Sequence, residues 1–77
     1  MNIDDFVRHF EGAVDDVAAG SLNPQTRFRD LSQWSSLVAL NIIAMVDTEY
    51  GVELSVEELR KCQSIEELFQ LLSGKKK

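Results

Sequence analysis

The stretch SSLVALNIIAMVDTEYGVEL, residues 35–54, decides the fold of this chain. No proline or glycine interrupts residues 36–50, and Gly51 stands where a helix commonly ends. Ser35 or Ser36 can cap the helix start, because a serine hydroxyl accepts an unpaired backbone N–H. Apolar side chains occupy most of the circumference: Leu37, Val38, Leu40, Ile42, Ile43, Met45 and Val46. Such a helix is either central or exposes part of its surface to a partner.

Three further helices are predicted around this one. Residues 2–18 carry an apolar stripe at helical spacing, with Asn2 as a plausible N-cap and acidic residues in the first turn. The patterns SVEE and SIEE, beginning at Ser55 and Ser64, are capping boxes that open the two remaining helices, of which the first is short. Residues 19–35 form a long loop, which its own apolar residues would attach to the bundle: Leu22, Phe28, Leu31 and Trp34. The sequence therefore predicts an all-α bundle of three longer helices and one short helix.

Length and charge limit the classes of function. The 77 residues form one domain, with residues 1–74 as the body and Lys75–Lys77 as a solvated basic tail. Residues 1–74 contain all 13 acidic residues and five of the eight basic ones, a net charge of −8. Such a body repels nucleic acid and anionic lipid and attracts basic protein surfaces. No apolar run is long enough to cross a membrane, the first residues are acidic rather than signal-like, and the single cysteine excludes an internal disulfide. We expect a cytoplasmic monomer.

Catalytic residues are scarce in this sequence. The one histidine, His9, lies within the first predicted helix, and the one cysteine, Cys62, has the character of a small core residue. No metal-ligand or phosphate-loop spacing is present. Enzymatic activity is therefore not expected. The notable feature is Ser36, at a helix start after a long loop, where free N–H groups and the helix dipole favour a phosphodiester. From the residues alone, a simple N-cap is the alternative.

The order of elements from Ser36 onward resembles the acyl carrier protein family, over nearly the full chain. Ser35-Ser36-Leu37 stands where the family has Asp-Ser-Leu at the start of its second helix. DTEYGVEL, residues 47–54, is similar to the family's acidic stretch with an aromatic residue and a glycine. Residues 55–62 and 64–72 correspond to its short third helix and its closing helix. The resemblance implies a four-helix bundle of acyl-carrier type.

The same resemblance implies a function. A phosphopantetheinyl transferase would use coenzyme A to attach a 4′-phosphopantetheine arm to Ser36, and the arm would hold an acyl group as a thioester. Acyl-loading and acyl-processing enzymes would supply the chemistry. The alternatives are a peptidyl or aminoacyl carrier, or a helical interaction module that shares the fold and bears no arm.

Two departures from the family pattern affect partner recognition. Ser35 replaces the family's aspartate, and the first half of the second helix lacks the acidic residues that usually face basic partners. We therefore expect a specialised carrier whose partners make more apolar contact, with recognition by these residues: Trp34, Ser35, Leu37, Val38, Asn41, Met45 and Asp47. The candidate lining of an acyl pocket is Ile43, Val46, Leu59, Ile65 and Leu68, for which plain core is the alternative.

Overall fold

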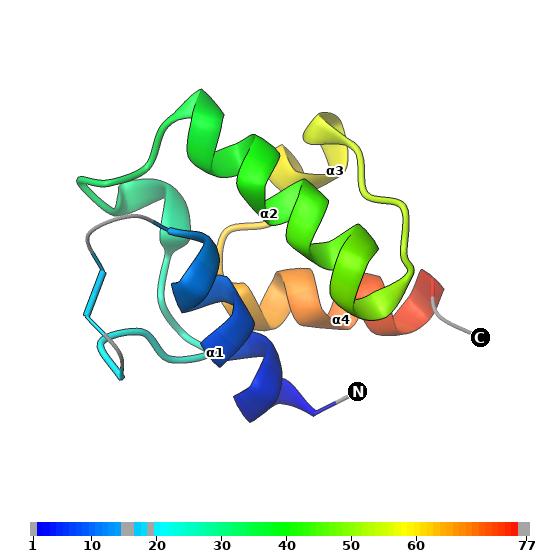
Figure 1. Ribbon diagram of the computed structural model, residues 1–77, viewed down its shortest axis with the longest axis horizontal. Helices are drawn as coiled ribbons and strands as arrows, with labels where there is room; N and C mark the ends of the chain where they lie inside the picture. Colours follow the sequence, from blue (N-terminus) through cyan, green and yellow to red (C-terminus); the bar gives the residue numbers. More distant parts are fainter. Residues whose placement is uncertain (1, 15–16, 19, 76–77) are drawn as a thin grey trace.

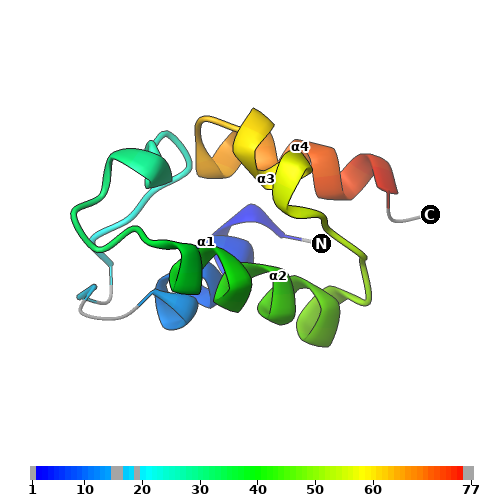
Figure 2. The same ribbon diagram turned by 90° about the horizontal axis from the view of Figure 1, so that it is seen from above.

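The part of the chain that the structure describes folds into four α-helices in two layers. The computed structural model describes residues 2–14, 17–18 and 20–75, and within these ranges it contains no strand. The helices are α1 (Ile3–Ala13), α2 (Ser36–Tyr50), α3 (Val56–Lys61) and α4 (Ile65–Lys75), and a 3₁₀ turn, η1, spans Phe28–Asp30. α1 and α2 lie in one layer, and α3 and α4 lie in the other (Figures 1 and 2). The predicted bundle of three longer helices and one short helix is confirmed.

The helix boundaries follow the caps that the sequence predicts. Ser35 caps α2, and Gly51 ends it in the left-handed region at φ +65°, which favours glycine. Ser55 and Glu58 form a complete capping box at α3. At α4 the Ser64 hydroxyl accepts the Glu67 N–H. The Glu67 carboxylate, however, accepts the N–H of Gln63 rather than that of Ser64, so this box is only half formed.

α1 is shorter than the predicted helix over residues 2–18. It begins after Asn2, whose side chain accepts the Asp4 and Asp5 N–H groups, and it ends at Ala13. Val14 is already extended, at φ −104° and ψ 122°, and it is buried in this conformation. The predicted extension to residue 18 is therefore wrong at Val14, and residues 15 and 16 lie outside the described part. The apolar stripe extends beyond the end of the helix, because Val14 is buried in the core although it is not helical.

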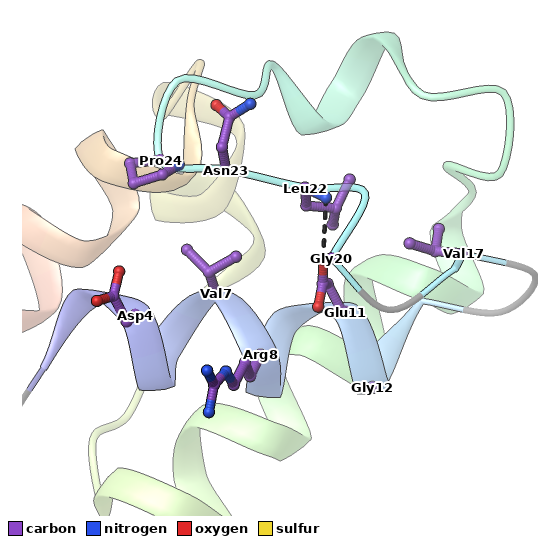
Figure 3. Close-up of a pocket in the computed structure, with 10 residues that line it drawn as sticks. All are labelled: Asp4, Val7, Arg8, Glu11, Gly12, Val17, Gly20, Leu22, Asn23 and Pro24. Carbon is purple, nitrogen blue, oxygen red and sulfur yellow. Dashed lines mark hydrogen bonds between the residues drawn. The ribbon is translucent and has the colours of Figure 1, made fainter.

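The long loop covers one end of the bundle, at the left of Figures 1 and 2. The Leu22 N–H donates to the buried carboxylate of Glu11 on α1, at 2.9 Å (Figure 3). The carbonyls of Pro24 and Thr26 accept the first N–H groups of α4, from Glu66 and Ile65. The loop therefore satisfies backbone donors that the start of α4 would otherwise leave unpaired.

The core lies between the two layers. Phe6 and Phe10 of α1 are fully buried, and their rings meet edge to face at a centroid distance of 6.3 Å. From the loop, Phe28 packs on Phe10 at 5.4 Å, and Leu22 is also buried, while Leu31 and Trp34 pack partly buried against the core. The prediction that apolar loop residues attach the loop to the bundle is thus confirmed.

Lys75 belongs to the bundle. It is the last residue of α4, and its ammonium group contacts the Glu58 carboxylate of α3 at 2.6 Å. The expected solvated tail over Lys75–Lys77 is therefore wrong at Lys75, and Lys76 and Lys77 lie outside the described residues.

Candidate functional site

The site is built on the first turn of α2. The Ser35 hydroxyl accepts the Val38 N–H at 3.2 Å, and the Ser35 carbonyl accepts the Ala39 N–H at 3.0 Å. Ser35, not Ser36, is therefore the cap of α2. Ser36 is the first helical residue, and it is exposed.

The polar groups of Ser36 are open to solvent or to a ligand. Its hydroxyl makes no hydrogen bond to any residue that the structure describes. The N–H groups of Ser36 and Leu37 likewise have no partner within the described ranges, as is usual for the first residues of a helix. These N–H groups lie at the positive end of the α2 dipole, which favours a phosphodiester on the Ser36 oxygen. This arrangement fits the attachment of a phosphopantetheine arm.

A chain of aromatic contacts holds Ser36 in place. Trp34 packs against Phe28 with ring centroids 5.0 Å apart, and Phe28 in turn packs against Phe10 of α1. The Trp34 N–H donates to the Leu31 carbonyl at 3.0 Å. These contacts anchor the residues that precede Ser36, so the exposed serine is presented from a rigid support. Trp34, predicted to contact partners, is thus half-buried and supports the site from below.

Exposed apolar side chains gather around Ser36. Among the described residues, the large hydrophobic side chains that remain exposed are Leu37 at 62%, Leu40 at 56% and Val56 at 37%. Leu37 and Leu40 follow Ser36 within little more than one turn of α2, and Val56 begins α3. Single exposed leucines are ordinary, but their grouping beside one serine marks a contact surface.

A pocket of about 450 Å³ adjoins Ser36, between the start of α2, α3 and η1. Leu40, Val56 and Leu59 supply its apolar lining, and Arg29 and Arg60 supply its charge. Neither arginine is among the site residues predicted from the sequence, and neither are Leu40 and Val56. Leu40 could have been found from its spacing of four residues from Ser36 on one helix face. The arginines come from segments far apart in the sequence, so no local pattern marks them.

One predicted recognition residue is placed wrongly. Val38 is only 4% exposed and belongs to the core, so it cannot contact a partner. The reason is that α2 is apolar on nearly every side, so its hydrophobic pattern does not show which face is buried. Leu37 takes the exposed position instead.

The other predicted recognition residues lie farther along α2. Asp47 is exposed, whereas Asn41 and Met45 are half-buried. Asn41 and Met45 line a shallow hollow together with Arg8 and His9 of α1, so they face a different side from Ser36. The structure therefore brings together only part of the predicted set at Ser36.

The residues predicted to line an acyl pocket are mostly core. Val46, Ile65 and Leu68 are fully buried, and Ile43 packs against the core. Leu59 is also buried, but it borders the pocket beside Ser36. The structure thus connects one of the five predicted residues with the site.

The two candidate nucleophiles, His9 and Cys62, lie in surroundings that give them structural rather than catalytic roles. His9 is half-buried; its Nδ1 lies 2.8 Å from the Tyr50 hydroxyl and its Nε2 lies 3.3 Å from the Glu49 carboxylate. Cys62 is buried and free, and burial raises the pKa of its thiol. A buried thiol with a raised pKa is a poor nucleophile, as expected of a core residue. The described residues contain no cluster of side chains able to hold a metal ion.

A larger hollow lies away from Ser36, between α1 and the loop (Figure 3). It measures about 810 Å³, and Asp4, Arg8 and Glu11 are its charged residues. The Glu11 carboxylate already accepts the Leu22 N–H. Since no predicted site residue lines it, this hollow is not the candidate site.

In the part of the chain that the structure describes, no helix is long and apolar enough to span a membrane.

Comparison with known proteins agrees with this geometry. The family model described as phosphopantetheine attachment site matches residues 12–72, which include Ser36, η1 and all of α2 and α3. No curated protein and no solved structure matches the chain significantly. Proteins of the matched family carry 4′-phosphopantetheine covalently and are generally non-catalytic carriers. Since the match covers well over half of the sequence, the chain belongs to the phosphopantetheine attachment site family, to which acyl carrier proteins belong.

Proposed function

We propose that this protein is an acyl carrier whose 4′-phosphopantetheine arm is attached to the hydroxyl of Ser36. The observation that carries the proposal is the division of roles at α2, where Ser35 caps the helix and leaves the Ser36 hydroxyl exposed and unpaired among the described residues. A modifying enzyme can therefore reach the hydroxyl without breaking a hydrogen bond of the fold.

Attachment requires a phosphopantetheinyl transferase and coenzyme A. The Ser36 hydroxyl loses its proton, its oxygen forms a bond to phosphorus, and the nucleotide half of coenzyme A leaves. The thiol at the end of the attached arm then carries the cargo. Within the protein, Ser36 supplies the anchor, and the free N–H groups of Ser36 and Leu37 stabilise the negative charge beside it.

An acyl cargo is favoured over an aminoacyl or peptidyl one by the surroundings of Ser36. Leu59 lies in the wall of the pocket beside Ser36 and is itself buried, so it offers apolar contact on the core side of the pocket, where a hydrocarbon chain gains from burial. The other four residues predicted to line an acyl pocket would extend this wall inward from Leu59. Loading and processing enzymes would approach over Leu37 and Leu40, which are exposed on the same side.

We also propose that the chain works as a monomer in the cytoplasm and has no catalytic activity of its own. The free, buried thiol of Cys62 fits a compartment in which thiols stay reduced. The first turn of α2 contains no acidic residue, which supports a specialised carrier with apolar rather than strongly basic partners.

Mass spectrometry of the intact chain tests the attachment site. After incubation with coenzyme A and a broad-range transferase, wild type and Ser35→Ala should each gain the mass of one phosphopantetheine arm, and Ser36→Ala should gain none. Ser35→Ala is the matched control, since it removes the neighbouring hydroxyl. An equal gain on Ser36→Ala would place the arm elsewhere. No gain on wild type would contradict the carrier function and favour an interaction module without the arm.

A further inference from the structure

The pocket beside Ser36 is positively charged in an acidic protein. Arg29 and Arg60 line it, and none of the described residues that line it is a carboxylate. Residues 1–74 as a whole have the opposite character, with a net charge of −8. Neither arginine forms an ion pair with a residue that the structure describes. Two arginines without an ion pair at one pocket favour an anionic ligand.

The two arginines reach the pocket from different segments. Arg29 lies in η1, and Arg60 lies in the last turn of α3. Burial and two glutamates raise the pKa of the Cys62 thiol, just after α3, and the positive charge of Arg29 opposes this rise. Arg29 therefore lies close to Cys62. η1 and the end of α3 are therefore neighbours, and both arginine side chains can serve the same small space.

The pocket also has an apolar part. Leu40 and Val56 are exposed, and Leu59 lies beneath them in the wall. A ligand that fits both parts has a negatively charged group joined to a short branched hydrocarbon. The proximal part of a phosphopantetheine arm has this chemistry, because its phosphodiester is linked directly to a pantoyl unit with two methyl groups.

The arm would enter this pocket without diffusing to it. Ser36 itself lines the pocket, so an arm attached there is held at the pocket mouth. Tethering gives such a ligand an effective concentration on the order of millimolar, so even weak contacts are occupied. Arginine suits the phosphodiester because its guanidinium group donates two parallel hydrogen bonds to phosphate oxygens.

We propose that Arg29 and Arg60 bind the phosphodiester of the arm while its pantoyl methyl groups pack on Leu40 and Val56. This docking rests on the proposed attachment of the arm to Ser36. The arm then docks on its own carrier instead of extending freely into solvent. Because both arginines are exposed, salt screens the contact, and docking weakens as ionic strength rises. Arg60 lies in the last turn of α3, where the helix dipole favours a positive charge. The dipole therefore explains an arginine at position 60, but it does not explain the one at position 29.

Nuclear magnetic resonance of the modified protein tests the docking. Wild type, the double variant Arg29→Gln/Arg60→Gln and the control Arg8→Gln are loaded from coenzyme A labelled with carbon-13 in the pantoyl methyl groups. Wild type should show nuclear Overhauser effects between these methyl groups and those of Leu40 and Val56. The double variant should lose them, and Arg8→Gln, which removes an exposed charge from α1, should keep them.

The outcomes separate docking from attachment. If the intact mass shows no arm on wild type, the attachment proposal fails. If the arm is present but shows no contact with Leu40 or Val56, or if the contacts persist unchanged in the double variant, the docking proposal is overturned. Loading with butyryl and with succinyl cargo should give the same contacts. Contacts with the succinyl form alone would overturn the assignment to the arm and give the pocket to a cargo carboxylate.

Discussion

Ser35 and Ser36 are adjacent in the sequence but have separate roles, because the Ser35 hydroxyl accepts the Val38 N–H at 3.2 Å and the Ser36 hydroxyl has no partner in the described part of the chain. Ser35→Ala should therefore lower the free energy of unfolding by about 1 kcal/mol through loss of the cap. Ser36→Ala should change it by less than about 0.5 kcal/mol, as is usual for an exposed position. Urea unfolding followed by circular dichroism measures both, and an equal loss in the two variants would contradict the assignment of the cap to Ser35.

Leu37 and Val38 provide a second matched pair, since one is exposed and the other is buried. Val38→Ala should destabilise the protein by about 2 kcal/mol, because it removes buried methyl groups from the core. Leu37→Ala should leave stability nearly unchanged and should slow loading by enzymes that contact this surface. The midpoint of urea unfolding gives the stabilities, and a stable Val38→Ala variant would show that the residue is not core.

The ion pair between Glu58 and Lys75 links α3 to the end of α4. The hydrogen bond from Lys75, followed by the Ser55 N–H, lowers the pKa of the Glu58 carboxyl from its ordinary value. Lys75→Met should raise the pKa of Glu58 toward that ordinary value, which a titration followed by carboxyl carbon-13 shifts would report. Glu57→Gln is the control, because Glu57 is exposed on the same helix and should leave the Glu58 titration unchanged.

The sign of the accompanying stability change follows from the direction of this shift. A carboxyl whose pKa is lower in the folded state stabilises the fold above its unfolded pKa, and this contribution is lost as the pH falls through the folded pKa. The difference in melting temperature between wild type and Lys75→Met should therefore be present at neutral pH and disappear in acid. A difference that persists at a pH below the folded pKa would show that Lys75 acts mainly by packing.

Tyr50 should titrate at a higher pH than a free tyrosine. Burial of the phenol raises its pKa first, and the negative charges of Asp5 and Glu49 add to the rise. Asp5→Asn should lower the pKa of Tyr50, whereas Asp30→Asn in the distant η1 turn should not. Ultraviolet absorbance of the phenolate measures the titration. Because the folded state favours the neutral phenol, this contribution to stability is present below the unfolded pKa and is lost as the pH rises through the folded pKa.

Local signals in the sequence predicted most of the helices. Gly51 and the serines at positions 35, 55 and 64 mark real ends of helices, because capping depends on hydrogen bonds within a few residues. The end of α1 was not predictable from the stripe. The buried carboxylate of Glu11 accepts the distant Leu22 N–H, and Val14 leaves the helix to pack in an extended conformation.

The site was predictable only in part. The position of Ser36 at a helix start follows from sequence, but the burial of Val38 depends on which side of α2 the other helices cover. Arg29 and Arg60 lie 31 positions apart, and only the packing of η1 beside the end of α3 brings them to one pocket. Tertiary contacts of this kind leave no periodic trace in the sequence.

The way in which α3 is held has a consequence for the pocket that it borders. Six residues are too few to form a stable helix in water on their own, so α3 depends on its capping box, on the buried Leu59 and on the partly exposed pair of Glu58 and Lys75. One of these supports is electrostatic and weakens as salt is added. We therefore expect the amide hydrogens of α3 to exchange faster than those of α2 at high ionic strength. The wall of the pocket that α3 forms would then be the first part of the bundle to open for a bulky cargo.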